Sequence, residues 1–124
     1  GAPVLVAEMN LKRLAAASIS ERSYEELPKF PGSSRDVAML VSADMAAGRV
    51  ADFFANHEEP LLESVELFDV FQDPSGEKLP ADKKSLAYSI CYRSDDRTLE
   101  AVEVEAAHAK LLDSLKSGLD VEFR

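Results

Sequence analysis

The chain has 124 residues, 46% of them apolar, and its 14 basic and 23 acidic side chains give a formal charge of −9. Its apolar fraction excludes a disordered acidic tail, and its length fits one domain. No stretch approaches the roughly 20 continuous apolar residues of a membrane span, and no targeting segment is recognised at the start. The charge alone argues against nucleic acid as a partner, because an acidic surface repels phosphate.

A single cysteine, Cys91, and two histidines, His57 and His108, limit the chemistry of the chain. A lone cysteine forms no internal disulfide, and one cysteine with two histidines cannot complete a usual zinc site. Neither histidine has an evident approach to Cys91, so nucleophilic catalysis is not favoured. We therefore expect a cytoplasmic protein with no structural metal, no cofactor of its own and no independent catalytic site.

Residues 1–29 are expected to form an arm and linker, separate from a domain at 30–124. The apolar run from Val4 to Leu11 predicts a strand too short to be stable alone. Pro28 and Pro31 restrict the Ser-, Glu- and Pro-rich segment that follows, which is typical of a linker. Residues 1–34 hold four basic and four acidic side chains, so the excess negative charge lies in 35–124.

Four strands are predicted beyond the linker. Val37, Met39 and Val41 alternate with smaller or polar residues, and the same period of two runs through 85–93. Residues 62–72 are rich in β-branched and aromatic side chains, and the turn signal that starts at Asp73 joins them to 85–93 as a long-looped hairpin. A short alternating strand at 119–124 ends the chain.

Two helices complete the pattern, each with an apolar stripe at a spacing of three and four residues. Asp44 is the predicted N-cap of the first helix, and Thr98 is the predicted N-cap of the second, which is expected to end at Gly118. The stripes consist of Val50, Phe53, Phe54 and His57 in the first helix and Val104, His108, Leu111 and Leu115 in the second.

The order β-α-β-β-α-β predicts an α+β fold, a ferredoxin-like split βαβ sandwich. Four antiparallel strands would then carry both helices on one face and leave the other face open. We assign the larger apolar residues to the helix side. The open face is expected to contain Ala38, Asp69, Phe71, Ser85, Ala87, Ser89 and Arg124.

An open face of this composition fits two classes of function. Phe71 offers a stacking platform for an unpaired base, Asp69 and Ser85 offer hydrogen bonds to a base edge, and basic side chains at the rim offer phosphate contacts. The candidates for the rim are Lys83, Lys84 and Arg124. A protein-contact or small-ligand-binding module would show the same pattern, so the residues alone leave both alternatives open.

Four blocks of sequence carry a more specific signal. In order they are Phe30-Pro31-Gly32-Ser33-Ser34-Arg35-Asp36, Leu62-Glu63-Ser64-Val65-Glu66-Leu67-Phe68-Asp69-Val70-Phe71, Lys84-Ser85-Leu86-Ala87-Tyr88 and Arg97-Thr98-Leu99. Together they strongly resemble the C-terminal ferredoxin-fold anticodon-binding domain of the bacterial phenylalanine–tRNA ligase β subunit. The resemblance covers about residues 30–124, and it implies that Val4–Leu11 is the last strand of a preceding catalytic-like module.

The resemblance implies an RNA-binding module that holds the anticodon stem-loop of tRNA(Phe). The parent enzyme would be an α2β2 heterotetramer that uses ATP and Mg²⁺, with the synthetic site on the α subunit. By motif, the residues expected to contact the anticodon are Ala38, Asp69, Phe71, Ser85 and Arg124. Phe71 replaces a tyrosine common in the family, which keeps the ring but loses a phenolic hydrogen bond. Ala101 replaces a frequent acid, which predicts an incomplete capping box at Thr98.

Overall fold

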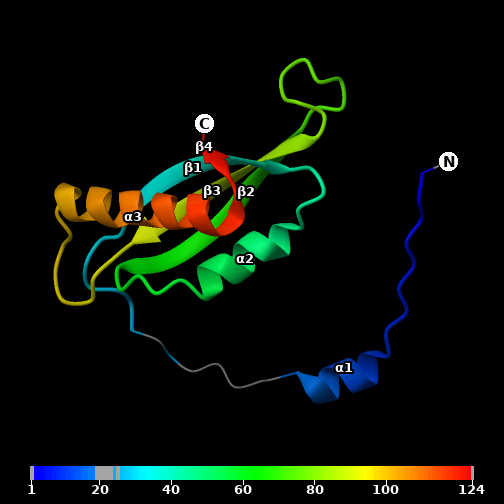
Figure 1. Cartoon of the computed structure of the whole chain (residues 1–124). Coiled ribbons are helices and arrows are strands. Elements are labelled where there is room, and N and C mark those ends of the chain that lie inside the picture. Colours follow the sequence, from blue (N-terminus) through cyan, green and yellow to red (C-terminus); the bar gives the residue numbers. More distant parts are fainter. Residues whose placement is uncertain (1, 19–23, 25, 124) are drawn as a thin grey trace.

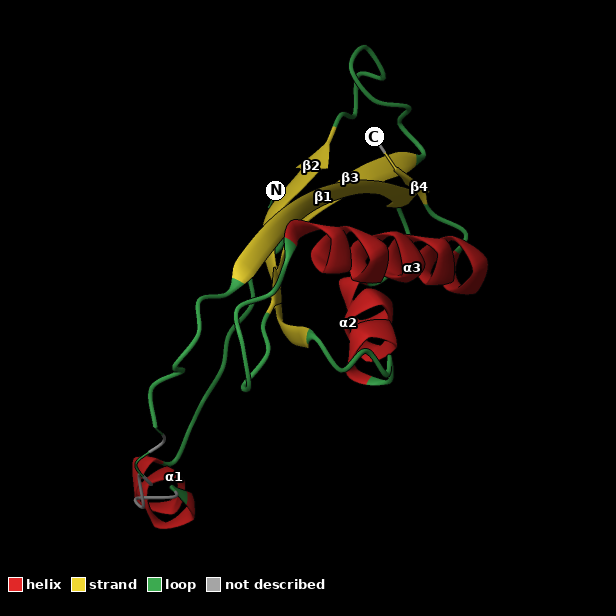
Figure 2. Cartoon of the chain, turned by 90° about the vertical axis from the view of Figure 1, so that its left-hand side faces the viewer, coloured by secondary structure: helices red, strands yellow, loops and turns green. Residues whose placement is uncertain are grey.

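The computed structural model describes residues 2–18, 24 and 26–123. Its main body is an antiparallel sheet of four strands in the order β2-β3-β1-β4. Both long helices lie on one face of this sheet, as Figure 2 shows. The predicted ferredoxin-like split βαβ sandwich is therefore confirmed. The elements of the sandwich are β1 (Ser33–Ser42), α2 (Ala47–Ala55), β2 (Leu62–Gln72), β3 (Lys83–Tyr92), α3 (Ala101–Leu119) and β4 (Glu122–Phe123).

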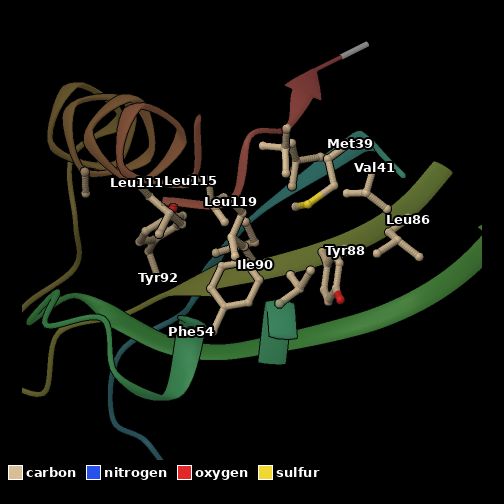
Figure 3. Close-up of a cluster of buried hydrophobic side chains, with 14 of the residues drawn as sticks. Met39, Val41, Phe54, Leu86, Tyr88, Ile90, Tyr92, Leu111, Leu115 and Leu119 are labelled. Carbon is tan, nitrogen blue, oxygen red and sulfur yellow. The ribbon is translucent and has the colours of Figure 1, made fainter. Parts of the chain in front are cut away.

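The core fills the space between the sheet and the two helices (Figure 3). From the sheet, Met39, Leu86 and Ile90 point into it with no exposed surface, and Leu111 and Leu115 of α3 are equally buried. These residues belong to the alternating strands and the helical stripe predicted from the sequence. Alternation in the strands thus separates an apolar face, covered by helices, from an uncovered one.

The helix ends differ from the predicted ones. Asp44 accepts a hydrogen bond from the Ser42 hydroxyl, and the N-cap of α2 is Ala46, whose side chain makes no capping bond. The N-cap of α3 is Glu100 rather than Thr98. The Glu103 carboxylate accepts the backbone N–H of Glu100 at 3.0 Å, so the reciprocal bond expected to be missing is present two residues later.

The C-terminal end of α3 also lies beyond its predicted position. Gly118 is inside the last turn, and the C-cap is Asp120, in the left-handed region with φ 51°. A Cβ at Gly118 would lie 2.9 Å from Cε2 of Phe53, so the glycine allows α3 to approach α2 closely. The predicted strand at 119–124 is correspondingly reduced to Glu122–Phe123 in the described chain.

Strand β2 changes the face of its side chains part-way along its length. Leu67 is opposite Tyr88 and Asp69 is opposite Ala87, so Phe68 is an extra residue between two successive pairs. Such a bulge shifts the alternation by one position. Val65 and Leu67 before it face the helices with Ile90 and Tyr88, whereas Asp69 after it lies on the open face.

The loop between β2 and β3 projects beyond the end of the sheet (Figure 1). The Asp73 carboxylate accepts backbone N–H groups from Ser75 at 2.9 Å and Lys78 at 2.6 Å. The hydrogen bond from the Ser75 hydroxyl, together with these backbone bonds, lowers the pKa of Asp73 to about 2. Gly76 has φ +73°, which L residues rarely adopt, so the turn requires glycine there.

The arm does not form the strand predicted for Val4–Leu11. Residues 2–10 have no regular secondary structure, and α1 (Leu11–Ala17) follows, capped by the Asn10 side chain, which accepts the Arg13 N–H at 3.1 Å. Figure 1 shows this segment apart from the sheet. A strand needs a neighbour for its backbone hydrogen bonds, and the described chain provides none here. The assignment of Val4–Leu11 to a preceding module and the boundary between residues 29 and 30 stay predictions.

Candidate nucleic-acid interface

The uncovered face of the sheet is organised in rows of residues that pair across the strands. Cross-strand partners in an antiparallel sheet point to the same face. One row runs Asp69, Ala87, Ala38, and the next runs Phe71, Ser85, Leu40, Glu122. Ala38, Asp69, Phe71 and Ser85, four of the five residues predicted for the site, therefore lie on one face in two adjacent rows. The fifth, Arg124, lies outside the described residues.

Two of these residues come from the edge strand β2, where the bulge turns them outward. The Phe71 side chain is 39% exposed, a large fraction for an aromatic ring, and Asp69 is exposed beside it. An exposed ring on a sheet presents a flat surface on which a base can stack. The carboxylate of Asp69 accepts hydrogen bonds from N–H groups and repels phosphate, which suits contact with a base edge.

The centre of the face is built from small residues. Ser85 on the central strand β3 is only 8% exposed, and Ala87 and Ala38 are half-buried. The absence of large side chains at these three positions leaves a low floor between the edge strands. A planar ligand can therefore approach the backbone of β1 and β3 closely.

Leu40 also belongs to this face, although the sequence pattern was not interpreted that way. Leu40 was grouped by size with the helix-side residues, yet it alternates with Met39 and Val41 and pairs with Ser85 and Glu122. It is half-buried on the open side. The signal that identifies it is parity: Val37, Met39 and Val41 share one face, so an even-numbered residue between them belongs to the other regardless of size.

The charge of the face is acidic in its described part. Asp36, Glu66, Asp69 and Glu122 lie on it or at its rim by their pairing. The nearby lysines predicted to reach phosphate are already engaged. Lys83 forms an ion pair with Glu122, which raises the pKa of Lys83, and Lys84 donates to the Ala43 carbonyl oxygen at 3.1 Å. This arrangement suits a few contacts to bases more than many contacts to phosphates.

Cys91 lies in β3, at the end opposite Ser85, and its contacts are those of a structural residue. Its thiol donates to Glu63 at 3.2 Å, and the Glu63 carboxylate also forms an ion pair with Arg93 at 2.8 Å. Burial, followed by the bond to Glu63, raises the pKa of Cys91. The thiol form is therefore favoured, which does not suit a nucleophile.

The two histidines lie among core side chains on the helix side. His57 stacks on Phe53 with ring centroids 5.5 Å apart. Nδ1 of His108 lies 3.0 Å from the Tyr92 hydroxyl. Neither arrangement joins a histidine to Cys91. Within the described ranges, the chain forms no cluster of three or more His, Cys, Asp or Glu side chains able to hold a metal ion. Among the described helices, none is both long and apolar enough to cross a membrane.

Comparison with known families agrees with this geometry. Residues 28–124 match the model of the ferredoxin-fold anticodon binding domain. The chain belongs to this family. The match includes all four strands of the sheet and both helices that cover it, so the open face described above is the uncovered face of a ferredoxin-fold anticodon binding domain.

The curated relatives of the chain are phenylalanine–tRNA ligase β subunits from several bacteria. The chain is 40% identical over 119 residues to the β subunit of Clostridium tetani, covering 96% of this chain and 15% of the relative. It is 39% identical over 121 residues to the β subunits of Symbiobacterium thermophilum and Anaeromyxobacter dehalogenans, covering 98% of this chain and 13% and 14% of those relatives. The chain thus spans about one-seventh of the length of the relatives it matches.

Proposed function

We propose that this anticodon-binding domain holds the anticodon stem-loop of tRNA(Phe) on the open face of its sheet. The observation that carries the proposal is the grouping of Ala38, Asp69, Phe71 and Ser85 in adjacent rows of the one sheet face that the helices leave uncovered. In a family of anticodon-binding domains, that face offers an aromatic ring, a carboxylate and a low floor within the reach of one unstacked loop.

Each residue has a distinct role in this proposal. Phe71 stacks on a base, which contributes about 1–3 kcal/mol in single-stranded recognition. Asp69 accepts N–H groups of a base edge, and the Ser85 hydroxyl donates or accepts. Ala38 keeps the floor low enough for the base edge to approach the strand. The guanidinium of Arg124 is assigned to phosphate at the end of the loop.

The wider role rests on the relatives, which are much longer than this chain. We propose that the domain belongs to an α2β2 phenylalanine–tRNA ligase that charges tRNA(Phe) in the cytoplasm. ATP and Mg²⁺ would be used at the synthetic site of the α subunit. Among the residues that the structure describes here, no three His, Cys, Asp or Glu side chains lie together as a metal site would require. This domain would contribute by binding the tRNA at a distance from the chemistry.

A titration of the 124-residue chain with the tRNA(Phe) anticodon stem-loop tests the proposal. NMR titration is suitable, because an acidic fragment is expected to bind weakly. Phe71→Ala should weaken binding about 5- to 150-fold, which corresponds to the loss of one stacked base. Val70→Ala is the matched control: it removes exposed apolar surface from the neighbouring position of β2, but Val70 pairs with Leu86 on the helix side.

The alternative of a protein-contact or small-ligand module predicts a different result. Binding of the stem-loop would then be absent, or equally weakened by Phe71→Ala and Val70→Ala. A stem-loop with an unrelated anticodon serves as the RNA control, because a nonspecific electrostatic contact would not distinguish the two loops. Equal affinity for both loops would contradict anticodon recognition by this face.

A further inference from the structure

The row that contains Leu40 differs from the other rows of the open face. It runs Phe71, Ser85, Leu40, Glu122 across all four strands, so a small residue on the central strand lies between two large apolar ones. In the adjacent row, Asp69 is followed by two alanines. The row beyond has Glu66, Ser89 and Asp36. Among the described rows, only the first has an apolar wall on both sides of a small floor residue.

The spacing of this row matches a planar ring. Neighbouring strands lie about 4.8 Å apart, so the backbones that carry Phe71 and Leu40 are about 9.6 Å apart. Carbon atoms make their best contact at about 3.5–4.0 Å, so a flat base touching both walls needs about 7–8 Å between them. The two side chains can close the difference by leaning toward each other. The Ser85 side chain is too short to fill the space.

Burial of the three residues supports the same geometry. Ser85 is 8% exposed although its side chain is small, whereas Phe71 is 39% exposed and Leu40 is half-buried. The serine is thus less exposed than the larger residues on either side of it, and we call the space above it, between Phe71 and Leu40, the slot. Its hydroxyl both donates and accepts, so it can meet the edge of any base without selecting one.

We propose that Leu40 is a further RNA-contacting residue, and that one unstacked base inserts on edge between Phe71 and Leu40 with its edge toward Ser85. This inference rests on the proposed function for the nature of the ligand and adds the position and orientation of one base. The slot selects for planarity, because both walls contact the faces of the ring. Asp69, in the next row, is left to contact a different nucleotide.

The test uses the 124-residue chain and the tRNA(Phe) anticodon stem-loop. Leu40→Ala should weaken binding about fivefold, near the lower limit for a stacked base because an aliphatic wall replaces an aromatic one. Leu40→Met should retain most of the affinity, since it conserves volume. Leu112→Ala is the control, since Leu112 is a partly buried leucine of α3 that packs on the core away from this face. Urea unfolding checks that each variant is folded.

A set of stem-loops with one abasic nucleotide each then identifies the inserted base. For the nucleotide in the slot, the affinities of the wild-type and Leu40→Ala chains should become equal, while the other abasic loops should preserve the fivefold difference. If Phe71→Ala weakens binding but Leu40→Ala does not, the slot is wrong and the proposed function stands. If the wild-type chain does not bind the stem-loop, both are overturned.

Discussion

The two faces of the sheet are made from the same strands, yet they differ in almost every physical property. On the helix side, Met39, Leu86 and Ile90 are fully buried in contact with α2 and α3. On the other side, their immediate neighbours Ala38 and Ala87 are small and only half-buried. Burial of large apolar side chains stabilises the fold, whereas low relief leaves room for a ligand.

Substitutions on the two faces of the sheet should therefore have different consequences. A large residue removed from the helix side leaves a cavity and lowers stability. A change on the open side alters a surface with few contacts and should leave stability nearly unchanged while affecting binding. Because neighbouring residues of a strand lie on opposite faces, substitution of one should change stability and substitution of the next should change binding. Three predictions test how strictly this separation holds.

The largest effect is expected on the covered face. Leu111→Ala removes a side chain with no exposed surface from the centre of the core and should lower the free energy of unfolding by about 2–5 kcal/mol. Urea unfolding monitored by circular dichroism measures it. Val102→Ala, on the same helix but 76% exposed, should change stability by less than about 0.5 kcal/mol. Similar losses for the two variants would show that burial does not distinguish the faces of α3.

A smaller effect, of a different kind, is expected on the open face. Asp69→Ala should weaken stem-loop binding by about 1–3 kcal/mol, the range for a good carboxylate contact to a base edge. Stability should change by less than about 0.5 kcal/mol, because the side chain is exposed. Glu66→Ala is the control, an exposed acid of the same strand opposite Ser89. An equal loss for Glu66→Ala would mean that the face contributes charge rather than a defined contact.

The smallest effect is a pH dependence that arises on the covered face. Burial lowers the pKa of His108 below its ordinary 6.5, with Arg35 acting in the same direction and Glu105 opposing it. As the pH falls below 6.5, the unfolded chain binds a proton at this histidine before the folded chain does. The free energy of unfolding should therefore decrease as the pH falls from 7 toward the lowered pKa. Unfolding curves at several pH values measure the slope.

His108→Gln provides the control for this slope. The variant removes the titrating group and offers an acceptor for the Tyr92 hydroxyl, which lies 3.0 Å from His108 in the wild-type chain. It should flatten the dependence between pH 7 and 5. The pKa values of Glu63, Asp73 and Glu103 are also lowered, but from ordinary values of 4.5 or below, so their contribution is lost at lower pH. Equal slopes for both chains would contradict the assignment to His108.

Much of the fold follows from the sequence because its signals are local and periodic. Alternation predicted the faces of β1 and β3, and the stripe through Val104, Leu111 and Leu115 predicted the buried side of α3. These patterns do not depend on details of neighbouring segments. The common face of Ala38 and Ser85 could be predicted for the same reason, whereas Asp69 and Phe71 have the same parity as Val65 and Leu67 and lie on that face because of the bulge at Phe68.

Other features depend on competition between neighbours. Asp44 and Thr98 are good capping residues, but the Ser42 hydroxyl occupies Asp44, and Glu103 with Arg97 fixes the start of α3 two residues after Thr98. The strand expected at Val4–Leu11 requires hydrogen-bonding partners that the described chain does not provide. Leu40 was missed because its size was given more weight than its position in the alternation.

The extra residue Phe68 in β2 has a consequence for how this surface tolerates change. The apolar residues of β2 that face the helices are at positions 65, 67 and 70, so their numbers change from odd to even at the bulge. If β2 instead paired regularly, with Phe68 opposite Ala87, Asp69 and Phe71 would rotate toward the helices and Val70 would turn outward, whereas deleting Phe68 would keep the observed pairs and faces. A slip of one residue in the pairing of β2 would thus bury a carboxylate and remove the ring from the surface without altering either residue. The bulge that accommodates this one residue, more than its identity, keeps Asp69 and Phe71 on the open face of the sheet.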